Sequence, residues 1–135
     1  MLSRTDAEQY EPTGREICIS ISDPDAQPAA ISNGFAAVLR LYFDDLAEAE
    51  APTDILFGRE HAGEITEFVE RWSGVDRIVV HCNMGVSRSP GVALGLCDLH
   101  DWASAHIERS HPGWNRLVRS VIKASAASAK KTRER

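Results

Sequence analysis

The segment His81–Pro90, which reads HCNMGVSRSP, combines a cysteine, an arginine and two serines around a single glycine. It follows the apolar run 77–81, RIVVH, which is typical of a strand buried in a parallel sheet. Ligands bind at the carboxyl ends of such strands, and Cys82 stands at that end. Gly85 permits a turn with positive φ, and Arg88 stands where a helix is predicted to begin. The segment therefore predicts a reactive cysteine in a loop between a strand and a helix.

This loop, residues 82–88, is called the cysteine loop below. Successive N–H groups in such a turn point into one concavity, and the following helix N-terminus adds partial positive charge. Both features suit a tetrahedral dianion such as phosphate, and the planar guanidinium of Arg88 can hold two of its oxygens. The same positive field favours the thiolate form of Cys82, which is the nucleophilic form. The cysteine loop is therefore predicted to bind a phosphate and to activate Cys82, the nucleophile that attacks it.

The sequence of this loop resembles a known family. His81-Cys82-x5-Arg88-Ser89 is similar to the HCx5R(S/T) signature of the cysteine-based protein tyrosine phosphatases. The fuller pattern HCxxGxSRSP resembles the dual-specificity branch, and a weaker similarity over residues 16–125 resembles its small bacterial members. The resemblance implies the phosphatase fold and a phosphatase that needs neither a metal nor another cofactor.

The resemblance assigns a role to each matching position. Cys82 attacks phosphorus and forms a cysteinyl-phosphate, and Ser89 donates a hydrogen bond to the sulfur as it leaves. His81 orients the loop from behind rather than transferring protons. Arg88 and the backbone N–H groups of the loop hold the three equatorial phosphate oxygens; the residues implied in phosphate binding are Asn83, Met84, Gly85, Val86, Ser87 and Arg88.

The resemblance also implies a general acid that follows a strand. The run Leu41-Tyr42-Phe43-Asp44-Asp45 matches the family's pattern and places Asp45 on the acid, 37 residues before Cys82. Asp44 is the alternative, and a third interpretation makes both aspartates solvated turn residues at a strand end. Asn115 stands where the family has the asparagine of a Pro-Asn pair that steadies the loop, although Trp114 replaces the proline. The simpler interpretation of Asn115 is a helix N-cap.

Three uncharged residues in the loop bear on the substrate. Asn83, Met84 and Val86 stand at positions where phosphoinositide-directed members carry basic residues. We therefore expect a phosphorylated protein or a small phosphomonoester, with phosphotyrosine favoured and phosphoserine or phosphothreonine also accepted by a shallow pocket. Two other functions stay open: a pseudophosphatase that binds phosphorylated partners without turnover, and a sulfurtransferase with a rhodanese-like loop.

Composition narrows the classes of partner. The 135 residues suit one domain, with a net charge of −5. Residues 1–114 carry 8 basic and 19 acidic side chains, whereas residues 115–135 carry 7 basic and one acidic. The acidic body disfavours nucleic acid, and no apolar run predicts a membrane span. The basic end is an anion-binding surface, a solvated tail or a helix folded back on the acidic body.

Three cysteines, of which Cys18 and Cys97 are interpreted as core residues, fit a reducing, cytoplasmic setting. The oligomeric state is not predicted.

The elements that must position the loop follow from hydrophobic periodicity. Alternating or β-branched runs predict strands at 16–22, 38–43 and 77–81, and apolar spacings predict helices at 59–72, 89–102, 103–110 and 114–127. This order is typical of an α/β domain with a small, mostly parallel central sheet flanked by helices. We expect a loose lead-in at 1–15, one catalytic domain at 16–127 and a basic tail at 128–135.

Overall fold

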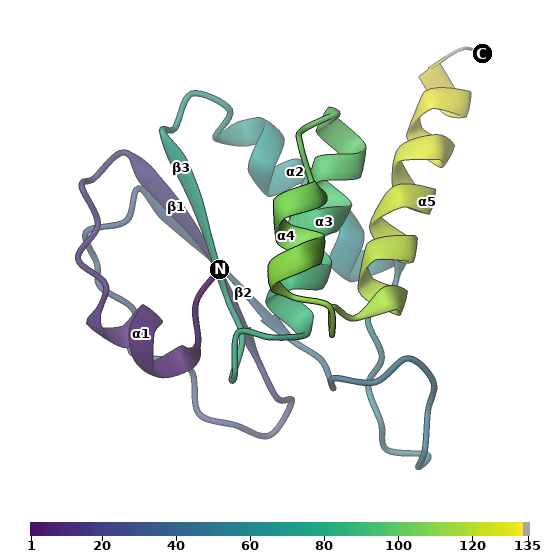
Figure 1. Cartoon of the computed structure of the whole chain (residues 1–135), viewed down its shortest axis with the longest axis horizontal. Coiled ribbons are helices and arrows are strands. Elements are labelled where there is room, and N and C mark those ends of the chain that lie inside the picture. Colours follow the sequence, from purple (N-terminus) through teal and green to yellow (C-terminus); the bar gives the residue numbers. More distant parts are fainter. Residues whose placement is uncertain (134–135) are drawn as a thin grey trace.

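A small parallel sheet carries the cysteine loop. The computed structural model describes residues 1–133, with side chains described up to residue 125. Strands β1 (Glu16–Ser22), β2 (Ala37–Tyr42) and β3 (Arg77–His81) lie in the order β2-β1-β3, and both pairings are parallel (Figure 1). Every residue of the central strand β1 is buried, as expected for a strand covered on both faces. The carboxyl ends of all three strands therefore meet at the edge where Cys82 follows β3.

Helices cover one face of this sheet. Helices α2 (Arg59–Arg71), α3 (Arg88–His100) and α5 (Arg116–Arg133) lie on that face, and α4 (Ala105–Ser110) lies beside α3 (Figure 1). Their buried apolar side chains form the main core with those of the sheet: Ile19, Ile21, Leu41, Phe43, Ala62, Ile65, Val69, Val80, Val92, Leu96, Val118 and Ile122. The sequence expectation of a small α/β domain with a parallel sheet is confirmed.

Two glycines let α5 approach α3 closely. A Cβ atom on Gly91 would fall 2.8 Å from the carbonyl oxygen of Asn115, and one on Gly95 would fall 2.8 Å from Ile122 Cβ. These distances are shorter than carbon contacts allow, so a larger residue at either position would push the helices apart. The close packing brings the start of α5, and with it Asn115, beside the start of α3.

The predicted loose lead-in at residues 1–15 is folded, which corrects that expectation. It contains helix α1 (Arg4–Gln9), which begins at the N-cap Ser3 and lies on the sheet face opposite α2, α3 and α5 (Figure 1). Leu2 pairs in a parallel bridge with His81, the last residue of β3. We call residues 2–10 the N-terminal strap. Sequence periodicity missed it because the helix spans only 6 residues and buries a single one, Ala7.

Helix α5 runs on to Arg133 and so passes the domain end predicted at residue 127. Residues 134 and 135 of the predicted basic tail lie outside the described residues. Within residues 1–133, no helix combines the length and the apolar character that a membrane crossing requires.

Candidate active site

The cysteine loop holds the sulfur of Cys82 between two hydrogen-bonding groups. Cys82 is 2% exposed at the carboxyl end of β3. The Gly85 N–H donates to Cys82 Sγ over 3.2 Å, and Ser89 Oγ lies 3.3 Å from the same sulfur. The loop therefore places the Cys82 sulfur within hydrogen-bonding distance of a backbone N–H and of a hydroxyl group.

The turn of the loop depends on Gly85. Its φ is +76°, a conformation that residues with a Cβ rarely adopt. Helix α3 begins at Arg88, three residues later, and Pro90 lies in its first turn. The positive end of the 13-residue helix α3 therefore lies at the loop, as the sequence predicts.

The buried guanidinium of Arg88 has hydrogen-bond acceptors at Nη1, whereas its Nε has none among the described residues. The residue is 4% exposed. Its Nη1 donates to Asp23 Oδ1 at 2.8 Å and to the carbonyl oxygen of Phe43 at 2.9 Å. Its Nε is buried and has no hydrogen-bond partner among the described residues. Because an unpaired buried donor is costly, Nε is a group that an anion with oxygen acceptors would satisfy.

The two aspartates after β2 have different surroundings. Asp45 is exposed, and its Oδ1 accepts hydrogen bonds from Ser87 Oγ at 2.7 Å and from Asn115 Nδ2 at 3.0 Å. Asp44 instead exchanges hydrogen bonds with the backbone of Ile55, through its own N–H and its Oδ2. The fold therefore brings Asp45 to the cysteine loop, whereas Asp44 closes the loop between residues 44 and 55.

Asn115 both caps α5 and braces the cysteine loop. Its Oδ1 accepts from the Val118 N–H at 3.1 Å, which is an N-cap contact. Its own N–H donates to the Ser87 carbonyl oxygen at 2.9 Å, and its Nδ2 donates to Asp45. The two interpretations of this residue are compatible, because the cap uses Oδ1 and the brace uses the two N–H groups.

His81 supports the loop from behind. Its ring is fully buried, with Nε2 2.6 Å from Ser20 Oγ and Nδ1 3.2 Å from the Cys82 carbonyl oxygen. Burial lowers the pKa of His81 below its ordinary value. In the neutral ring, Nδ1–H donates to the carbonyl and Nε2 accepts the Ser20 proton. This arrangement fixes the backbone at Cys82 and leaves no ring nitrogen for proton transfer in the site.

The other two cysteines lack such surroundings. Cys18 is buried on the opposite face of the sheet, and burial raises its pKa to about 12. Cys97 packs against Leu94 and Ile107, and burial raises its pKa as well. Both are core residues, as the sequence predicts.

Asp23 belongs to the site through its contact with Arg88, although it lies outside every motif of the sequence. It follows β1 directly, at the sheet edge from which Cys82 also emerges. That position was the available signal, since polar residues after parallel strands collect at one edge.

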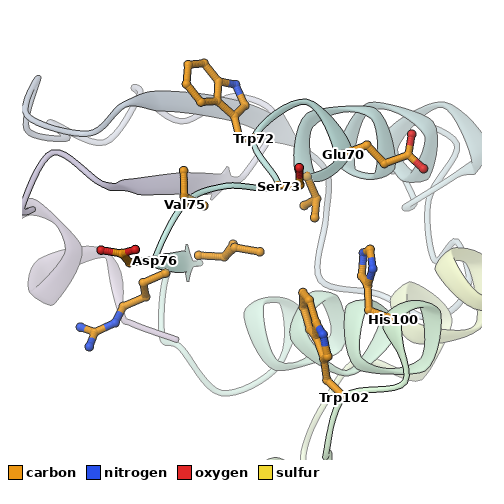
Figure 2. A pocket seen from close by; sticks show the side chains of 10 residues that line it. Glu70, Trp72, Ser73, Val75, Asp76, His100 and Trp102 are labelled. Carbon is orange, nitrogen blue, oxygen red and sulfur yellow. The ribbon is translucent and has the colours of Figure 1, made fainter.

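A cavity of about 630 Å³ lies elsewhere, near the amino end of β3. Figure 2 shows side chains from the ends of α2 and α3 around it, including His100 and Trp102. Two of its charged residues already have partners, because Asp76 pairs with Arg15 and Arg77 with Glu16. Neither Cys82 nor Arg88 lines this cavity, so the candidate site stays at the cysteine loop.

No protein-family model matches the chain, and no curated protein matches it closely enough to count as a relative. Among the described residues, no three His, Cys, Asp or Glu side chains gather in a way that could hold a metal ion.

Proposed function

We propose that this protein is a cysteine-dependent phosphatase of the protein tyrosine phosphatase superfamily, close to its dual-specificity branch. The observation that carries the proposal is the buried Nε of Arg88, which has no acceptor in the described chain. This nitrogen belongs to the residue that begins α3, after a loop whose N–H group at Gly85 donates to the Cys82 sulfur. A phosphate oxygen in the loop supplies the missing acceptor.

Two displacements at phosphorus make up the reaction. The Cys82 thiolate attacks, so that an S–P bond forms while the P–O ester bond breaks, and Asp45 gives its proton to the leaving oxygen. Water then attacks phosphorus and gives a proton to Asp45 while the S–P bond breaks. Ser89 donates a hydrogen bond to the departing thiolate, and inorganic phosphate is released.

The exposed side chains of the cysteine loop would give a bound substrate an uncharged environment. Met84 and Val86 are 70% and 54% exposed, and Asn83 is exposed as well. Apolar and neutral groups favour a singly phosphorylated residue over a polyphosphorylated one, which would need basic side chains. We therefore assign phosphotyrosine as the preferred group, with phosphoserine and phosphothreonine as further substrates.

Hydrolysis of p-nitrophenyl phosphate tests the activity. Cys82→Ser should abolish turnover and keep binding of inorganic phosphate. Arg88→Lys should lose both rate and affinity, because an ammonium cannot replace the guanidinium fork. A Cys82→Ser variant as fast as the wild type would rule out the proposed mechanism. Phosphopeptides carrying tyrosine, serine or threonine phosphate then rank the substrates.

One observation favours a second candidate, a module that binds phosphorylated partners without turnover. The Oδ1 atom of Asp45 accepts hydrogen bonds from both Ser87 and Asn115, and a carboxylate that stays in these contacts throughout binding would leave the chain without a general acid. Phosphopeptide binding without hydrolysis, by the wild-type chain, would support this candidate.

A further inference from the structure

We propose that Asp23 is a positioning residue, which fixes the guanidinium of Arg88 so that its Nε edge faces the phosphate. This inference rests on the proposed function and adds a residue that neither the cysteine motif nor the general-acid pattern includes. Asp23 reaches Arg88 through an ion pair of 2.8 Å between Asp23 Oδ1 and Arg88 Nη1.

Groups from the ends of three strands converge on Arg88. Asp23 follows β1, and Phe43, whose carbonyl oxygen also accepts from Nη1, follows β2. Arg88 itself comes after the loop that leaves β3. One nitrogen of the guanidinium thus contacts the residues that follow two strands, while Arg88 itself ends the loop that follows the third.

The planarity of guanidinium makes this contact directional. Nε–H and the neighbouring Nη2 share one edge of the group, and Nη1 lies away from that edge. Fixing Nη1 therefore fixes the direction of Nε, whose hydrogen has no acceptor among the described residues. A donor held in place before the anion arrives has less freedom to lose on binding.

The segment that carries Asp23 is itself anchored. The Asp23 carbonyl oxygen accepts from the Ala26 N–H at 3.1 Å, which closes a turn. Farther along, Arg4 donates to the Pro28 carbonyl oxygen and Glu8 accepts from the Ala30 N–H. The N-terminal strap thus contacts the segment that follows Asp23, and the turn after Asp23 orients its backbone.

An opposite role would make the Asp23 carboxylate a competitor that occupies the place of phosphate. The two roles predict effects of opposite sign. A competitor lowers phosphate affinity, so that its removal strengthens binding, whereas a positioning residue strengthens affinity. The geometry favours positioning, because Asp23 contacts Nη1 and leaves the Nε edge unpaired.

Binding of inorganic phosphate, measured by calorimetry, and kcat/KM for p-nitrophenyl phosphate test the proposal together. Asp23→Asn keeps an oxygen acceptor and removes the charge, and we expect about a tenfold loss in both quantities. Asp23→Ala should lose more, and Asp23→Glu should recover part of the loss. The matched control is Asp25→Asn, an exposed residue of the same segment, which should stay within about twofold of the wild type.

A double-mutant cycle separates positioning from a general loss of fold. In an Arg88→Lys background, Asp23→Asn should cost much less than in the wild type, because the group it positions is gone. Equal or tighter phosphate binding by Asp23→Asn, or full additivity in the cycle, would overturn the inference. Phosphate binding without turnover by the wild type would refute the proposed phosphatase only, since the affinity test of Asp23 still applies.

Discussion

Asp45 contacts the cysteine loop through one carboxylate oxygen, which accepts from Ser87 and from Asn115. Both hydrogen bonds end on Oδ1, so the second oxygen is the one that can carry a proton to a leaving group. The neighbouring Asp44 uses its Oδ2 for the Ile55 N–H instead. The two aspartates, adjacent in sequence, thus give a matched pair for testing the general acid of the proposed reaction.

Asp45→Asn should slow substrates in proportion to the basicity of their leaving groups. Phenyl phosphate needs a proton on its leaving oxygen more than p-nitrophenyl phosphate does, so we expect about a hundredfold loss for the first and about tenfold for the second. The measurement is kcat for both esters. Asp44→Asn should reduce the rates with both esters little and to the same extent. If Asp45→Asn slowed phenyl phosphate and p-nitrophenyl phosphate by the same factor, that result would contradict the role of Asp45 as the acid.

Ser89→Ala should slow the second step more than the first. The hydroxyl lies 3.3 Å from Cys82 Sγ and can stabilise the thiolate as it leaves phosphorus. Without it, the cysteinyl-phosphate should accumulate, and p-nitrophenol should appear as a burst equal to the enzyme concentration before a slower steady state. Rapid mixing followed by mass spectrometry of the intact chain detects the added phosphate. Unchanged steady-state turnover with no burst would argue against this role.

Among the structural elements, the N-terminal strap packs directly against the cysteine loop. Leu2 donates to the Val80 carbonyl oxygen and accepts from the Cys82 N–H, and the Arg4 N–H donates to Asn83. A Cβ on Gly85 would lie 2.9 Å from the backbone of Leu2 and Ser3. The strap therefore lies against the turn of the loop and leaves room only for glycine there.

Gly85→Ala should destabilise the protein by about 2 kcal/mol or more and abolish most activity, because positive φ and the backbone contact both oppose a methyl group. Urea unfolding and p-nitrophenyl phosphate hydrolysis measure the two effects. Gly63→Ala is the control, since Gly63 is exposed on α2 with no atom within 4 Å of the added Cβ. That change should stabilise by about 0.5–1 kcal/mol. Similar results for the two variants would show that the strap does not constrain the loop.

The regular elements could be predicted because each carries its own periodicity. Strands 16–22 and 77–81 have the predicted bounds, and the helix predicted at 59–72 ends one residue earlier, at Arg71. Local sequence thus places Cys82 after a strand and Arg88 at a helix start. The strap could not be predicted in this way, because its backbone hydrogen bonds to β3 join residues nearly eighty positions apart. No local pattern records such a pairing.

The same limit applies to the site. The cysteine loop is a contiguous segment, so its place between a strand and a helix could be predicted from its own residues. The contact of Asp23 with Arg88 spans 65 positions, and that of Asn115 with Asp45 spans 70. Both arise from the parallel order of the strands and from the close packing of α5 on α3. Their residue types were visible in the sequence, whereas their partners were not.

Across the whole molecule, the basic C-terminal part of the chain contacts acidic side chains of the body. Arg119 on α5 pairs with Asp98 on α3 at 2.8 Å and with Glu108 on α4 at 3.5 Å. The hydrogen bonds with Arg119 lower the pKa of Asp98. Of the three interpretations of the basic end, the described part of α5 supports a helix folded back on the acidic body.

Stability should fall as the pH drops below about 6.5, because of His81. Its pKa is lowered by burial, so in this range the unfolded chain binds a proton that the folded chain resists. The free energy of unfolding then rises with pH, by at most about 1.4 kcal/mol per unit for one proton, and levels off above the ordinary histidine pKa. Urea unfolding between about pH 5 and 7.5 measures this slope above the range where carboxylates titrate. His81→Gln should remove most of it, whereas His106→Gln, at an exposed position on α4, should keep it. An unchanged slope in His81→Gln would mean that another group is responsible and that the buried ring beneath Cys82 is not a source of acid sensitivity.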